Sequence, residues 1–153
     1  MTIETFLNDP VNSYLIYIPG KNTDVMIGVP HHAPLGIQHL PCESHPTSDE
    51  NTGFIGYRLA QLLDCPCLIA GNYFIDPNKY KSSDYFKKIE EVSPKFLIEI
   101  ILILKSPLVR WISPLYLRKL LTSYPLHFRG TQRYVTTPSV AILFRFTSEP
   151  PSP

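Results

Sequence analysis

The sequence predicts an α/β fold in which a mostly parallel central sheet is flanked by helices. Short apolar runs alternate with segments whose apolar residues recur at helical spacing, an order typical of strand–helix–strand units. The most apolar run, FLIEIILIL at 96–104, is too short for a membrane-spanning helix and is expected to be a buried strand. The 153 residues, 44% of them hydrophobic, suit a single hydrophobic core.

The first two strands are expected at 13–18, SYLIYI, and at 24–30, DVMIGVP, because both runs are rich in aromatic and β-branched residues. The intervening PGKNT contains turn residues, which predicts a hairpin or two neighbouring strands. The second strand is predicted to end at Pro30. His31 and His32 would then lie just past the carboxyl end of a strand, where open α/β sheets commonly carry their sites.

A loop and a helix are predicted next. Residues 32–46 contain three prolines and a glycine and are expected to form a loop. The segment 47–64 predicts an amphipathic helix, and its first residues, TSDE at 47–50, match a capping box. The apolar face of this helix is expected to consist of Ile55, Leu59, Leu62 and Leu63.

Two more strands and another helix complete the predicted sheet domain. The run CLIAG at 67–71 is short, apolar and bounded by Pro66, which is typical of a central parallel strand. Ser83 is expected to cap a helix over 84–91, and KFLIEI at 95–100 returns to the sheet.

The chain changes composition near residue 100. Residues 1–100 carry 12 acidic and 7 basic side chains, a net charge of −5, whereas residues 101–153 carry one acid and seven bases, a net charge of +6. We therefore predict an α/β hydrolase-like domain at 1–100 and a basic, divergent tail at 101–153 that need not fold by itself. Within the tail, the pattern predicts a helix at 114–121 and a strand at 139–146.

Charges and cysteines indicate the partners and the compartment. The basic residues of the tail are dispersed among apolar ones, which disfavours nucleic-acid binding. Cys42, Cys65 and Cys67 are an odd number of cysteines in a chain whose first residues lack a signal-peptide pattern, which favours buried thiols in a reducing cytoplasm. No membrane association is expected, and the sequence leaves the oligomeric state open.

Two adjacent histidines followed by an acidic pair suggest a metal site. His31, His32, Asp49 and Glu50 are of the residue types that hold zinc in hydrolases, where the ion activates a water molecule. Two simpler interpretations stay open at this point. The histidines would face solvent in a loop, and Glu50 would complete the capping box.

Three stretches of the chain resemble the N-formylglutamate amidohydrolase family. They are VPHHAP at 29–34, the stretch from HPTSDENTG to IDPNK at 45–79, and FLIEI at 96–100. The resemblance covers about residues 25–100 and implies a fold similar to that of the zinc carboxypeptidases. It also implies metal-dependent hydrolysis of an amide in a small-molecule substrate that carries a carboxylate.

The same resemblance implies roles for individual residues. His31, directly after Pro30, matches the first metal ligand, and Glu50 matches the second, with His32 and Asp49 as alternates. A lysine suits a substrate carboxylate. The substrate-binding residues that the resemblance implies are Asp76, Asn78 and Lys79.

The chain departs from the family after FLIEI. Members continue with a His-Gly step whose histidine is the third ligand, whereas here the next histidine is His127. The family's catalytic carboxylate has no candidate except Glu149, close to the last residue, so the catalytic residue stays unknown. The zinc site is therefore expected to be incomplete, in a truncated or degenerate relative with weak or no hydrolysis. A reading-frame shift in the gene would explain the break, and translating the other two frames tests that explanation.

Two other functions stay open. A non-catalytic small-molecule binding or interaction module would keep the pocket formed by His31, His32, Asp76 and Lys79 without hydrolysis. An active zinc amidase or peptidase would need His127 or another subunit to complete the site. Stoichiometric zinc would favour the second of these, because three or more ligands are needed to hold the ion through dialysis.

Overall fold

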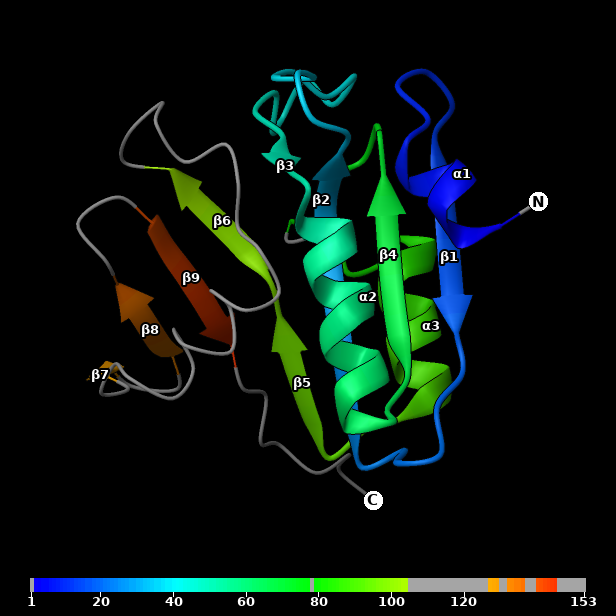
Figure 1. The fold of residues 1–153 in the computed structure, drawn as a ribbon, viewed down its shortest axis with the longest axis vertical. Helices are drawn as coiled ribbons and strands as arrows, with labels where there is room; N and C mark the ends of the chain where they lie inside the picture. Colours follow the sequence, from blue (N-terminus) through cyan, green and yellow to red (C-terminus); the bar gives the residue numbers. More distant parts are fainter. Residues whose placement is uncertain (1, 78, 105–126, 130–131, 137–139, 146–153) are drawn as a thin grey trace.

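The computed structural model describes residues 2–77, 79–104, 127–129, 132–136 and 140–145 (Figure 1). These residues form a five-stranded sheet with helices on both faces, and a four-stranded sheet after it. In chain order, the elements are α1 (Ile3–Leu7), β1 (Tyr14–Ile18), β2 (Val25–Ala33), β3 (Asp49–Glu50), α2 (Thr52–Leu63), β4 (Cys67–Gly71), α3 (Asp84–Val92), β5 (Phe96–Glu99), β6 (Ile101–Leu104), β7 (His127–Arg129), β8 (Gln132–Thr136) and β9 (Val140–Arg145).

Strand β2 is the centre of the first sheet. On one side it pairs in parallel with β4, and on the other side its residues 25–28 pair with β5 and its residues 32–33 with β3, also in parallel. β1 runs antiparallel to β4. The sheet is therefore mixed, which confirms the α/β class, and its parallel pairs are those around β2. The first two strands were predicted to form a hairpin or to be neighbours, and both arrangements are wrong, because β4 lies between β1 and β2.

Helices cover both faces of this sheet (Figure 1). On one face, Ile27 and Val29 of β2 pack in a cluster with Leu59 of α2. On the other face, Met26 packs in a cluster with Tyr85 of α3. Successive residues of a strand point to opposite faces, which is why the neighbours Met26 and Ile27 belong to different clusters.

Helix α2 differs from its prediction at the start and on its buried face. It begins at Thr52 after Asn51, which has a left-handed backbone, so the predicted capping box is wrong. Its buried face consists of Thr52, Gly53, Gly56, Leu59 and Ala60, while Leu62 and Leu63 are exposed. Small residues let the helix lie close to the sheet, because a Cβ at Gly56 would come within 2.4 Å of a Val29 methyl group.

Strand β2 continues past Pro30, so the two histidines lie inside the strand and not in a loop. Both are almost fully buried, which excludes the solvent-facing interpretation. Proline has no N–H for a strand ladder and is tolerated at irregular positions. The pairing of β2 with β4 shifts register between Val29 and His32, and Pro30 lies within this irregular stretch.

The predicted strand at 96–104 is divided at Ile100. Its first half, β5, pairs with β2, while its second half, β6, pairs antiparallel with β9 in a second sheet of order β6-β9-β8-β7. Strand β9 confirms the strand predicted at 139–146. The helix predicted at 114–121 lies outside the described residues.

Strand β4 has the predicted bounds, and α3 begins as predicted after Ser83, whose hydroxyl accepts a hydrogen bond from the Phe86 amide at 3.4 Å.

Cys42, Cys65 and Cys67 are free and buried, as expected. Among the helices that the structure describes, none has both the length and the apolar character needed to cross a membrane.

Candidate metal centre

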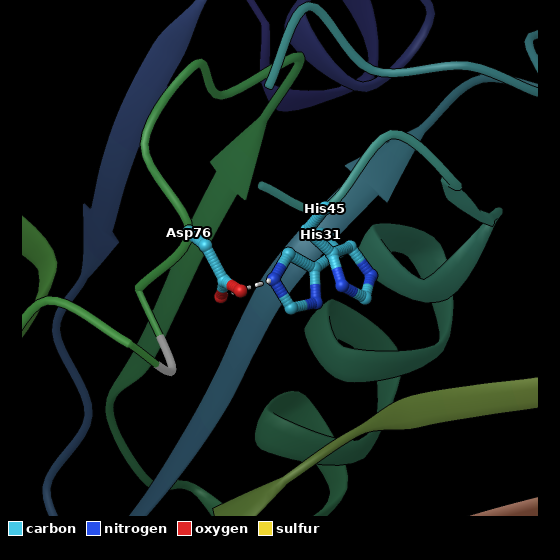
Figure 2. A group of neighbouring side chains, drawn as sticks. All are labelled: His31, His45 and Asp76. Carbon is cyan, nitrogen blue, oxygen red and sulfur yellow. Dashed lines mark hydrogen bonds and ion pairs between the residues drawn. The ribbon is translucent and has the colours of Figure 1, made fainter. Parts of the chain in front are cut away.

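The candidate site lies at the carboxyl ends of β2 and β4, where the chain segments that follow these strands meet. His31 comes from the end of β2, and His45 from the segment between β2 and β3. Asp76 comes from the segment between β4 and α3, and Asp49 opens β3. Figure 2 shows His31 and His45 face to face, with Asp76 directed at the outer edge of the His31 ring.

The His31 imidazole lies between two buried carboxylates. His31 is 1% exposed, and its Nε2 donates to Asp76 Oδ1 at 3.1 Å. Its Nδ1 lies 3.8 Å from Asp49 Oδ2, which is beyond hydrogen-bond distance. Nδ1 and Asp49 Oδ2 are buried and have no hydrogen-bond partner in the described part of the chain. Each of the two ring nitrogens therefore faces a carboxylate.

His45 adds a second imidazole. Its ring stacks on that of His31, with centroids 3.9 Å apart and an angle of 16° between the planes. Desolvation lowers the pKa of His45, and the neighbouring His31 lowers it further, so both effects favour the neutral ring that a metal ion needs. A ring nitrogen of His31, a ring nitrogen of His45 and a carboxylate oxygen of Asp76 all lie within 4.8 Å of one another. This group could hold a metal ion.

His32, the alternate histidine ligand, has a structural role in this arrangement. Its Nε2 donates to the Leu7 carbonyl at 3.0 Å, and its Nδ1 accepts from the Gly53 amide at 3.0 Å. The partners fix the tautomer, because a carbonyl only accepts and an amide N–H only donates. His32 thereby caps the first turn of α2 and ties it to α1. Burial lowers the pKa of His32 to about 4.

The two acidic candidates on β3 point in different directions. The Glu50 carboxylate accepts a hydrogen bond from the Gly36 amide at 2.8 Å on the surface. Asp49, the alternate, is the one whose carboxylate faces His31. Consecutive residues of a strand point to opposite faces, so one of the pair had to turn away from the site.

The residues predicted to bind substrate divide between two roles. Asp76 is 2% exposed and belongs to the group of His31, His45 and Asp76 that could hold a metal ion, which we call the metal cluster. Lys79 lies beside it, with Nζ 3.9 Å from Asp76 Oδ2, and donates to the carbonyl of Ser44 at 2.8 Å. The Lys79 side chain is 58% exposed, so it can reach a ligand from the rim of the site. Asn78 lies outside the described residues.

His45 is the site residue that sequence reasoning missed. The third ligand was expected after the strand at 96–100, whereas His45 lies in the segment that follows His31 directly. Its only sequence signal is that it lies four residues before Asp49, and this does not by itself identify a ligand. His127, the proposed substitute, begins β7, which β8 and β9 separate from β6. At about 4.8 Å per strand, the β7 backbone is roughly 14 Å from that of β6.

No protein-family model matches the chain, and neither a curated protein nor a solved structure matches it. Function therefore has to be inferred from the geometry of the site. The residues present fit a zinc ion by their chemistry, because imidazole nitrogen and carboxylate oxygen are its usual ligands besides thiolate. The buried Nδ1 of His31 and Oδ2 of Asp49, which lack hydrogen-bond partners in the described part of the chain, support the same conclusion.

Proposed function

We propose that this protein binds a zinc ion through His31, His45 and a carboxylate, as a degenerate relative of the N-formylglutamate amidohydrolases with weak or no hydrolysis. The observation that carries the proposal is the burial of one imidazole between two carboxylates and against a second imidazole. Burying charged and polar groups is costly unless they are paired or bind a metal ion. A cluster of this kind is therefore better explained by metal binding than by stability.

The two carboxylates take different roles toward the ion. A histidine that binds a metal through one nitrogen usually donates its other N–H to a carboxylate, which fixes the orientation of the ring. Asp49 and Asp76 face opposite nitrogens of His31. Whichever of the two binds the ion, the other holds the ring in place.

Weak hydrolysis follows from this use of the carboxylates. A bound zinc ion would polarise an amide carbonyl and lower the pKa of a bound water molecule. An efficient hydrolase also needs a free general base within reach of the reacting group. Asp49 and Asp76 are both committed to the ion or to His31, so neither is left for proton transfer.

Lys79 supports a ligand that carries a carboxylate. Its ammonium group is at the edge of the metal cluster and its side chain is more than half exposed. Its hydrogen bond to the carbonyl of Ser44, the residue before His45, holds Lys79 close to the His45 backbone. A small molecule with an amide at the ion and a carboxylate at Lys79 would use both features.

The first test is the metal content of the purified protein after exhaustive dialysis. We expect about one zinc per chain, because a site with three or more ligands retains the ion. The variants His31→Ala and His45→Ala are expected to lose it. His39→Ala is the matched control, since His39 is exposed and lies on the same segment as His45. Absence of zinc in the native protein, or its retention in His31→Ala, would overturn the proposal.

The same preparation then tests hydrolysis. Zinc-loaded protein is incubated with N-acyl amino acids, and release of the free amine is followed. We expect turnover far below the typical enzyme rate of about 10 per second, and the residual rate should disappear in His31→Ala. Efficient turnover would show that a general base is present and that the protein is an active amidase.

A further inference from the structure

Half of the exposed large apolar side chains in the described part of the chain are on the two segments that carry His45 and Asp76. The described residues include eight exposed large hydrophobic side chains, and three of these are on the segment that carries Asp76. They are Phe74, 59% exposed, Ile75, 37% exposed, and Tyr80, 50% exposed. A fourth, Leu35, lies on the segment that carries His45. We call Phe74, Ile75 and Tyr80 the apolar rim.

The apolar rim is close to the metal cluster. Phe74 and Ile75 directly precede Asp76, so the Cα atoms of Phe74 and Asp76 are at most about 7 Å apart. The Tyr80 amide donates to the Asp76 carbonyl at 3.1 Å, so the backbone turns and Tyr80 also lies close to Asp76. Lys79 lies between them in sequence and contacts the Asp76 carboxylate. A cation and apolar side chains thus share one short segment beside the cluster.

Part of the apolar rim is held in place by buried structure. The Phe74 ring stacks on Tyr73, with centroids 5.7 Å apart and an angle of 23° between the planes. Tyr73 is buried in the cluster that includes Tyr85 of α3. A fixed aromatic face loses little conformational entropy when a ligand packs on it, which favours binding.

We propose that the site selects an N-acyl amino acid with an apolar side chain, preferably an aromatic one, over an N-acyl amino acid with an acidic side chain. This inference rests on the proposed function, which supplies the metal ion for the amide and Lys79 for the carboxylate. The apolar rim then receives the side chain. An acidic side chain would lose part of its hydration against the exposed apolar surface of Phe74, Ile75 and Tyr80, whereas an apolar side chain would gain by packing there.

The test is calorimetric titration of the full-length protein, both zinc-loaded and metal-free, with N-formyl-L-phenylalanine and N-formyl-L-glutamate. We expect the phenylalanine derivative to bind at least about tenfold more tightly, since a well-placed apolar group contributes a factor of this order. Phe74→Ser should abolish the preference and Phe74→Leu should keep most of it. Leu62→Ser is the matched control, because Leu62 is a similarly exposed apolar residue on α2, away from this segment.

Several results would overturn the inference. These are equal affinities, tighter binding of the glutamate derivative, no binding of either compound in either form, or an unchanged preference in Phe74→Ser. Circular dichroism checks that Phe74→Ser is folded, and Tyr80→Ser replaces it if it is not. Zinc retention without an apolar preference would overturn this inference alone. An apolar preference in a protein that retains no zinc would overturn the proposed metal function alone.

Discussion

Acid is expected to destabilise the folded protein through His32. Burial disfavours the charged imidazolium, and this effect lowers the pKa of His32 from its ordinary 6.5 to about 4, although the bond to the Leu7 carbonyl opposes it. Below pH 6.5 His32 is protonated in the unfolded chain, whereas in the folded protein it stays neutral until the pH approaches 4. Stability contributed by the neutral ring is therefore complete above pH 6.5 and lost as the pH falls toward 4. The loss is about 2 kcal/mol at pH 5 and about 3 kcal/mol at pH 4.

Urea unfolding followed by circular dichroism at several pH values measures this loss, with His32→Asn as the comparison. Asparagine keeps an acceptor for the Gly53 amide but does not titrate. At pH 7.5 the variant should be less stable by about 2 kcal/mol, because the buried Leu7 carbonyl loses its donor. Its stability should then change less with pH than that of the native protein. Desolvation also lowers the pKa of His45, but this group is present in both proteins and cancels in the difference. Parallel pH curves would refute the reasoning.

Three further predictions concern the packing of α2, the thiols and the carboxylates. Gly56→Ala should lower the free energy of unfolding by about 1–3 kcal/mol, measured by thermal denaturation, because the added methyl group would overlap Val29. The three cysteines are buried and burial raises the pKa of Cys67, so a thiol reagent should react with none in the native protein and with all three in urea. Asp49→Asn and Asp76→Asn should weaken zinc binding to different extents. Loss of the carboxylate that only orients the His31 ring should weaken it by about 10–100-fold, and loss of the carboxylate that binds the ion should weaken it more. Equal losses in a competition titration would contradict this division of roles.

Elements whose signal is local could be predicted from the sequence. Strand β4 is a short apolar run bounded by Pro66, and α3 has Ser83 as its cap, so both are specified by their own residues. The pairing of β1 with β4 could not be predicted, because it joins strands separated by α2 and about 50 residues of chain. The continuation of β2 through Pro30 also depends on its partners, since the irregular pairing with β4 accommodates the missing N–H.

The candidate site divides in the same way. The sequence predicts His31 as a metal ligand and Asp49 as an alternate ligand, because they are next to recognisable elements. It predicts Asp76 as a substrate-binding residue, whereas the structure places Asp76 in the group that could hold a metal ion. His45 could not be predicted, because a histidine in an irregular segment has no periodicity that relates it to a strand. Its position depends on backbone contacts that fold the segment back on itself, including the Leu40 amide to the Pro46 carbonyl at 2.8 Å.

The charge balance of the site favours a bound cation. Asp49 and Asp76 are both buried, and the lysine Lys79 contacts Asp76, so one more positive charge would balance the two carboxylates. A metal ion bound by His31 and His45 would supply that charge, because buried charged groups are stabilised by a partner charge or a coordinated metal ion.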